Sequence, residues 1–136
     1  MKFGVCRGLD DFESIKIASE VGIDYYECGF GSLANYDDEK FNKCKDYLNE
    51  NNLPCLVANG FLPGDLKVVG DSIDYGALSE YLDKGFERAK NLGVKKIVFG
   101  SGGARSFPEG YSLEKAKDLG YTCVFICGNG EFYGKV

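Results

Sequence analysis

The sequence predicts an α/β fold in which parallel strands alternate with helices. Four short apolar runs begin near residues 3, 24, 54 and 95, and each is followed by a helix or by the start of one. This order of strand and helix is typical of parallel βαβ units. With 136 residues, of which 44% are hydrophobic and 27% charged, the chain also has the size and composition of one soluble domain with its own core.

The first predicted unit begins with the apolar run from Phe3 to Cys6, which we interpret as a strand. Asp10 and Asp11 offer an N-cap for the helix that follows, and Gly22 marks the end of that helix. The apolar residues at helical spacing between these signals are Phe12, Ile15, Ala18 and Val21.

The remaining units repeat this order. A strand over 24–30 (DYYECGF) precedes a helix over 37–52, and a strand over 53–63 (LPCLVANGFLP) precedes a helix between Asp74 and Gly93. The fourth predicted strand is 95–101 (KKIVFGS). The apolar faces of the two helices carry Phe41, Cys44 and Leu48 in the first, and Leu78, Leu82, Phe86 and Ala89 in the second.

Two architectures fit this order of elements. One is a small open doubly wound sheet, and the other is part of a closed (β/α)8 barrel. In both, ligands bind where the carboxyl ends of the strands run into their loops. The residues at these ends are therefore the candidate site residues, namely Arg7, Glu27, Asn59 and the loop from Ser101 to Arg105.

Charge and hydropathy disfavour two classes of partner. The net charge is −5, the sequence pI is about 4.8, and no run of Lys and Arg forms a basic stripe, so a nucleic-acid partner is not expected. The first residues lack the apolar region of a signal peptide, and no apolar stretch approaches membrane-spanning length. We therefore expect a cytoplasmic protein without a membrane partner.

The six cysteines do not form a recognisable metal or redox motif. Cys6, Cys28 and Cys55 lie in strand-like runs and are predicted to be small core residues in a reducing compartment. Cys123 and Cys127 form a CxxxC rather than a CxxC, and the chain has no histidine to complete a mixed site. No residue is therefore assigned to a metal.

The loop after the fourth strand is rich in glycine and carries a single cation. Gly100, Gly102 and Gly103 would let backbone N–H groups approach a ligand, and Arg105 offers planar donors suited to a phosphate or carboxylate. Alternatively, the glycines form a tight turn and Arg105 pairs with Glu109.

Glu27 and Asn59 are the polar candidates of the second and third strands. Period-two alternation places Tyr25 and Glu27 on one face of the strand and Tyr26 and Cys28 on the other. Glu27 would bind sugar hydroxyls or act on a proton, or else form a structural ion pair with a rim cation such as Arg7. Asn59 would hydrogen-bond a hydroxyl, or only adopt the left-handed turn that Asn-Gly favours.

Four segments carry a resemblance to a known family. MKFGVC, GIDYYECGF, LVANGFLPGDLKVVG and above all NLGVKKIVFGSGGARSFPEGY resemble the first four βα units of the sugar phosphate isomerase/epimerase family. That family has the xylose isomerase-like TIM barrel, which family-2 apurinic (AP) endonucleases share. The resemblance covers about 1–117. It implies an enzyme that uses a divalent metal of the Mn, Mg or Zn type to move a proton next to a carbonyl of a small sugar or sugar phosphate.

The chain departs from this family in length and in its residue types. A complete barrel needs about 250 residues, so this chain supplies about half of one. The family's metal ligands, carboxylates with a histidine, come from later strands, and this chain has no histidine. We therefore expect weak or no activity from the chain alone, with no metal bound. The alternative is a non-catalytic α/β domain that binds a small ligand or phosphate.

The C-terminal residues do not continue the family pattern. We interpret 1–118 as a half barrel of four βα units and 119–136 as an atypical tail that includes YTCVFICGNGEFYGKV. Three explanations stay open: a frameshift or premature stop, an internal deletion that brings forward a fifth strand over 121–127 with Glu131 near a metal-ligand position, or a genuine small protein with its own closing strand.

A half barrel would expose two strand edges and an apolar inner face. Two copies could cover both edges and close a barrel of eight or ten strands with two-fold symmetry. We therefore expect a homodimer that completes the barrel.

Overall fold

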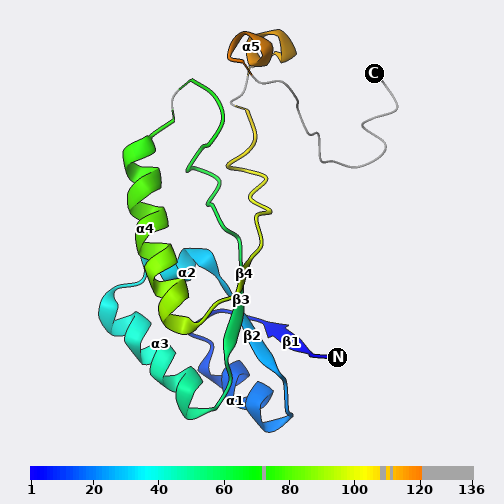
Figure 1. Cartoon of the computed structure of the whole chain (residues 1–136), viewed down its shortest axis with the longest axis vertical. Coiled ribbons are helices and arrows are strands. Elements are labelled where there is room, and N and C mark those ends of the chain that lie inside the picture. The colour runs from blue at the N-terminus through cyan, green and yellow to red at the C-terminus, as the bar shows by residue number, and fades with distance from the viewer. Residues whose placement is uncertain (72, 108–109, 111, 121–136) are drawn as a thin grey trace.

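A four-stranded parallel sheet forms the centre of the computed structural model, which describes residues 1–71, 73–107, 110 and 112–120 (Figure 1). The strand order in the sheet is the order in the chain, β1-β2-β3-β4, and every neighbouring pair is parallel. The predicted α/β fold of parallel βα units is therefore confirmed. The strands are β1 (Gly4–Cys6), β2 (Tyr25–Gly29), β3 (Cys55–Asn59) and β4 (Lys96–Ile97).

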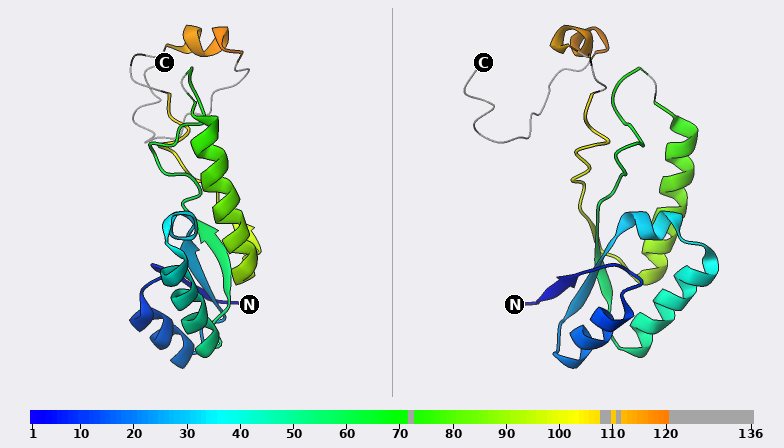
Figure 2. Two further views of the ribbon diagram at one scale, coloured as in Figure 1. Left: turned by 90° about the vertical axis from the view of Figure 1, so that its left-hand side faces the viewer. Right: turned by 180° about the vertical axis from the view of Figure 1, so that it is seen from behind.

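Four helices of the described chain connect successive strands and lie together on one side of the sheet (Figures 1 and 2). They are α1 (Phe12–Glu20), α2 (Phe30–Asn35), α3 (Asp38–Glu50) and α4 (Tyr75–Leu92). A further helix, α5 (Leu113–Asp118), follows the last strand and lies apart from the sheet (Figure 1). Along β2, Tyr26 and Cys28 are fully buried beneath the helices, whereas Tyr25 and Glu27 are half-buried on the opposite face. The alternation predicted for this strand is therefore confirmed.

Aspartates begin the three long helices, as local capping chemistry predicts. The side chain of Asp11 accepts a hydrogen bond from the Ser14 backbone N–H at 3.0 Å, and Asp37 and Asp74 cap α3 and α4 in the same way. Gly93 ends α4 in the left-handed conformation, with φ of +81°. The main helix boundaries were therefore predictable from the sequence.

Three elements differ from the sequence prediction. Helix α2 was not predicted, because the apolar Phe30 was read as the end of a strand although it is the first residue of this helix. β3 ends at Asn59 rather than at Pro63, since Gly60 turns the chain with φ of +58°. β4 is confined to Lys96–Ile97, although the backbone N–H of Val98 still donates to the Ala58 carbonyl at 2.8 Å.

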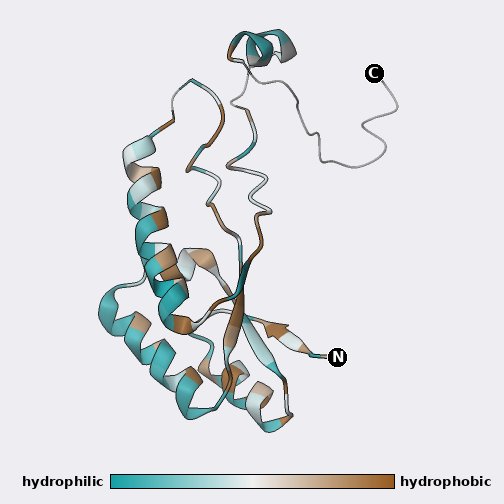
Figure 3. Ribbon diagram, in the orientation of Figure 1, coloured by the Kyte–Doolittle hydropathy of each residue, from teal (hydrophilic) through white to brown (hydrophobic). Residues whose placement is uncertain are grey.

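The core fills the space between the helices and the sheet. β3 is strongly apolar, while the outer surfaces of α3 and α4 are mainly hydrophilic (Figure 3). Tyr26 is fully buried, and its hydroxyl donates to the Gly8 carbonyl at 2.8 Å. Burial of each large apolar side chain contributes about 1.5–3 kcal/mol relative to exposure. The same core contains Leu9, Ile15, Phe30, Leu33, Phe41, Cys44, Leu48, Leu53, Cys55 and Ala89.

One buried cation joins three helices. Arg88 of α4 is 4% exposed, and its guanidinium donates to the carbonyls of Leu33 at 2.9 Å and Tyr36 at 2.5 Å, and also to the Asp38 carboxylate. It also lies 4.8 Å from the centre of the Phe41 ring. Arg88 therefore satisfies carbonyls at the end of α2 and fixes the start of α3, a role that the sequence pattern did not indicate.

Candidate functional site

Three polar side chains meet near the carboxyl ends of β1, β2 and β3. Cys6 and Asn59 are the last residues of β1 and β3, and Glu27 lies two residues before the last residue of β2. Strand register places Cys6 beside Glu27 and Gly29 beside Asn59. The Asn59 side-chain amide donates to Glu27 Oε1 at 2.6 Å, and the same Nδ2 atom lies 2.9 Å from Cys6 Sγ. All three side chains stand on the face of the sheet that the helices leave uncovered. We call these residues the Glu27 cluster.

Glu27 retains an oxygen that can accept a hydrogen bond from a ligand. Its Oε1 atom is used by Asn59, and within the described residues no hydrogen bond or ion pair reaches Oε2. A half-buried carboxylate fixed by a neighbouring amide is pre-organised to accept hydrogen bonds from hydroxyl groups or to take a proton. The cluster can therefore orient a small polar ligand at the carboxyl ends of the strands.

The structural alternatives predicted for these two residues are wrong. Arg7 contacts Glu27 only through the backbone, where its N–H donates to the Glu27 carbonyl at 3.2 Å, and no side-chain ion pair joins them in the described part of the chain. The left-handed conformation of the Asn-Gly pair belongs to Gly60, and Asn59 is the last residue of β3. Asn59 is thus held by the strand and not by the turn.

Cys6 is a correction to the prediction that it lies in the core. Its side chain is exposed, whereas Cys28 and Cys55 are buried as predicted. Since Val5 packs against the core, period-two alternation along β1 turns Cys6 to the uncovered face. The same alternation that located Glu27 could therefore have located Cys6. Cys123 and Cys127 lie outside the described residues.

The predicted loop residues form a second group, built around backbone contacts. Ser101 has φ of +38°, and its hydroxyl accepts a hydrogen bond from the Leu62 backbone N–H at 2.8 Å. A Cβ atom at Gly103 would lie 2.9 Å from the Gly64 Cα atom, so Gly103 lets two backbones pack together. A Cβ atom at Gly102 or Gly100 would have no neighbouring atom within 4 Å.

Two further contacts tie this loop to the segment after β3. Lys67 donates through its ammonium group to the Gly103 carbonyl at 2.6 Å, and the Val68 backbone N–H donates to the Ala104 carbonyl at 3.1 Å. The loops after β3 and β4 accordingly run side by side (Figure 2). The contact between Lys67 and Gly103 was not predicted from the sequence, because nothing in the polar segment around Lys67 indicates a partner for its side chain.

Arg105 closes its own loop. Its Nε atom donates to the Gly100 carbonyl at 3.0 Å and its Nη2 atom at 2.5 Å, and the guanidinium lies 5.5 Å from the centre of the Phe99 ring. The side chain is exposed, so donors on its outer edge can still reach an anion. The predicted alternative partner, Glu109, lies outside the described residues.

The described residues do not fit the divalent metal that the family resemblance implies. Among them, no three His, Cys, Asp or Glu side chains are placed to hold a metal ion, and the whole chain lacks histidine. The Glu27 cluster contributes one carboxylate and one thiol, fewer protein ligands than the three or four that hold Zn²⁺. We therefore derive no chemical step through a metal.

A hollow of about 460 Å³ lies away from the Glu27 cluster, beside α2, the segment after β3 and the first half of α4. Its lining includes Asn35, Asp65, Glu80, Tyr81 and Lys84. No residue of the Glu27 cluster or of the loop from Ser101 to Arg105 lines this hollow, so it is distinct from the predicted site residues.

Comparison with solved structures identifies the fold. The chain is similar to a D-psicose 3-epimerase crystallised in the presence of D-fructose, with a TM-score of 0.57 and 14% sequence identity over 71% of this chain and 36% of that one. The fold is part of a TIM barrel. The described chain thus spans about a third of the length of that epimerase. No protein-family model and no curated protein matches the sequence significantly.

No helix in the described part of the chain is both long and apolar enough to cross a bilayer.

Proposed function

We propose that the chain belongs to the sugar isomerase/epimerase group of TIM barrels and binds a small sugar or sugar phosphate at the Glu27 cluster. Similarity of the fold to an epimerase supports the class of ligand. The observation that carries the proposal is the half-buried Glu27 carboxylate, which lies two residues before the carboxyl end of β2, is fixed there by Asn59, and has one oxygen without a partner among the described residues. Ligands of TIM barrels bind at these strand ends.

The role proposed for Glu27 is to accept hydrogen bonds from sugar hydroxyls and, in a competent assembly, to take the proton beside the carbonyl. Asn59 keeps the carboxylate in place and offers its amide oxygen to a second hydroxyl. Because the described residues do not fit the implied metal, we propose that the chain alone binds sugar with weak or no turnover.

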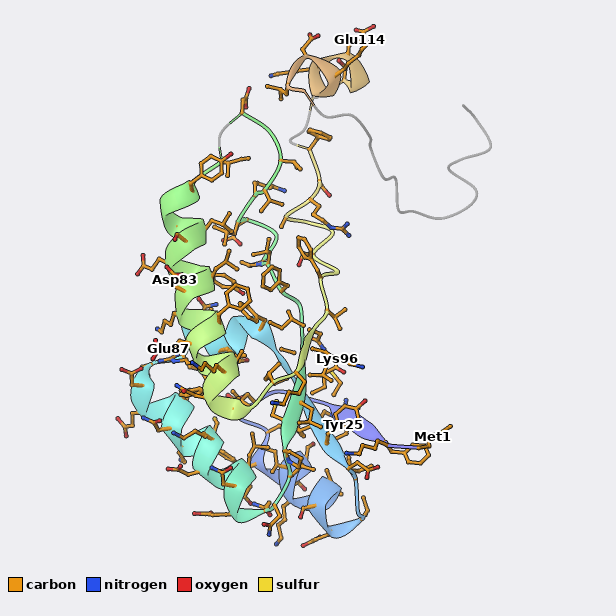
Figure 4. The ribbon with its side chains drawn as sticks, viewed as in Figure 1. Met1, Tyr25, Asp83, Glu87, Lys96 and Glu114 are labelled. Carbon is orange, nitrogen blue, oxygen red and sulfur yellow. The ribbon has the colours of Figure 1, made fainter. Side chains whose placement is uncertain are left out.

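Titration calorimetry with D-psicose, D-fructose and a ketose phosphate tests this proposal. Glu27→Gln keeps the shape of the side chain but removes its charge, and should weaken sugar binding at least about tenfold. The matched control is Glu87→Gln, an exposed carboxylate on the outer surface of α4 (Figure 4). No detectable sugar binding by the unmodified chain, or equal effects of the two variants, would contradict the proposal.

A second candidate function is phosphate binding by the loop from Ser101 to Arg105. The exposed guanidinium of Arg105, held against Phe99, is the observation that favours it. In this case inorganic phosphate alone should raise the melting temperature, and Arg105→Ala should abolish that response while an unphosphorylated sugar has no effect. An unchanged phosphate response in Arg105→Ala would reject this candidate.

A further inference from the structure

The sheet has two edges without a partner strand in the described part of the chain. β1 pairs only with β2 and β4 pairs only with β3, so each carries a row of backbone groups on its outer side. An unpaired edge of a parallel sheet is a template for another strand. Because every strand points the same way, a new strand that continues the pattern must also be parallel.

The face of the sheet opposite the helices is also uncovered, which is unusual for a parallel sheet. Register aligns Cys6, Glu27, Val57 and Lys96 in one row across this face. None of the four is buried, and Val98, the first residue after β4, is 50% exposed. Figure 4 shows Tyr25 and Lys96 on the side turned away from α3 and α4.

This row corrects the prediction that the inner face is apolar. It carries one anion, Glu27 on β2, and one cation, Lys96 on the edge strand β4. Among the described residues, Lys96 has no ion-pair partner. When two copies of the chain meet, the cation of each row can therefore face the anion of the other.

We propose that a second copy of this chain completes the barrel, with β4 of each protomer pairing in parallel with β1 of its partner. Eight strands suffice to close a barrel whose interior is filled by side chains, and four are half of that number. The strand order becomes β1-β2-β3-β4 twice around a two-fold axis along the barrel. Pairing of β4 with the partner's β4 about a two-fold axis perpendicular to the sheet would be antiparallel and would leave both β1 edges open.

Closure in this way places the two Glu27 clusters at one mouth and alternates two anions with two cations around the interior. Lys96 of β4 then lies next to the partner's β1, and the partner's Glu27 lies one strand further around the barrel, on β2. The candidate site would consist of residues from both protomers. This inference rests on the sheet edges and on the charge pattern, and does not depend on the proposed sugar ligand.

The test is the solution mass of the purified chain by sedimentation equilibrium over a range of concentrations. We expect a reversible dimer of twice the 14.9 kDa chain mass. Lys96→Glu should weaken the dimer at least about tenfold, because it places four carboxylates in the closed interior. Lys95→Glu, the same change at an exposed neighbour outside the row, is the matched control and should have little effect.

A charge swap gives the decisive comparison. Combining Lys96→Glu with Glu27→Lys restores one anion and one cation per row, so it should recover most of the dimer that Lys96→Glu loses. Circular dichroism confirms that each variant is folded. Four outcomes would each overturn the proposal. The mass could be that of a single chain at every concentration, or that of an assembly larger than a dimer. Lys95→Glu and Lys96→Glu could have equal effects, or the charge swap could fail to restore the dimer.

Discussion

Gly85 of α4 lies directly against the ring of Phe30, the first residue of α2. A Cβ atom at Gly85 would come within 2.4 Å of two ring carbons of Phe30, which is fully buried. The ring is also held by Phe61, whose centroid is 4.9 Å away, and by Phe86 at 5.5 Å. The absence of a side chain at Gly85 is therefore what allows α4 to pack against α2 so closely.

We expect Gly85→Ala to lower the free energy of unfolding by about 1–3 kcal/mol, although alanine is the better helix former. The ring of Phe30 cannot move away without disturbing Phe61 and Phe86. Urea unfolding followed by circular dichroism measures the change. The control is Gly31→Ala in α2, where the nearest atom to the new Cβ is 3.7 Å away. Equal stability of Gly85→Ala and the unmodified chain would contradict the packing argument.

Arg88→Met should lower the free energy of unfolding by about 2–4 kcal/mol. The substitution keeps the apolar stem but leaves the carbonyls of Leu33 and Tyr36 without their donor. Thermal unfolding at neutral pH provides the measurement. Lys84→Met removes an exposed cation from the same helix and should change stability by less than about 0.5 kcal/mol. A similar loss in both variants would show that helix charge, and not the buried contacts, is responsible.

Cys6 should react with an alkylating reagent at least about a hundredfold faster than Cys28 and Cys55 in the folded chain. Cys6 is exposed, whereas a hydrogen bond with Cys55, together with burial, raises the pKa of the Cys28 thiol. Peptide mapping by mass spectrometry after brief labelling reports each site separately. Labelling in urea, where all sites should react alike, is the reference. Rapid modification of Cys28 without denaturant would show that the helical layer opens readily.

Asp10→Asn should destabilise the chain at pH 7 but not in strong acid. Lys40 Nζ lies 2.7 Å from Asp10 Oδ2 and holds the pKa of that carboxyl below its ordinary value of 3.8, with a further contribution from Tyr36. A carboxyl with a lowered pKa stabilises the folded chain above its unfolded pKa and loses this effect as the pH falls through the folded value. Since the pair is half-exposed, the effect should be small.

The urea midpoints of Asp10→Asn and the unmodified chain, compared between pH 7 and pH 2, test this expectation. The difference should disappear as the pH falls below 3.8. Asp46→Asn, at an exposed carboxylate of α3 that forms no ion pair within the described residues, should show no such dependence. A constant difference for Asp10→Asn across the whole range would rule out the ion pair as its cause.

The strand and helix order was predictable because its signals are local. Aspartate caps, terminal glycines and the periodicity of apolar residues each depend on a few neighbouring positions, and these located α1, α3, α4 and the four strand centres. Helix α2 was missed since its stability comes from distant contacts. The ring of Phe30, its first residue, packs against Gly85, far along the chain.

The candidate site was predictable only in part. Alternation along β2 identified the face of Glu27, and strand order brought Asn59 to it. The role of the glycine-rich loop could not be predicted from its composition. Gly103 meets Gly64 and Ser101 receives the Leu62 N–H, and these partners lie in a segment that carries no regular pattern. Its use by a ligand stays a prediction.

The contacts between the loops after β3 and β4 have a consequence for how this fold can vary. Leu62 contacts Ser101 and, two residues later in both loops, Gly64 meets Gly103, while the Val68 N–H donates to the Ala104 carbonyl further along. Removing one residue between the first two contacts in either loop would move the glycine pair out of alignment. We therefore expect an insertion or deletion in one of these two loops to be tolerated only when the other loop changes length with it, so that the two segments vary together during evolution.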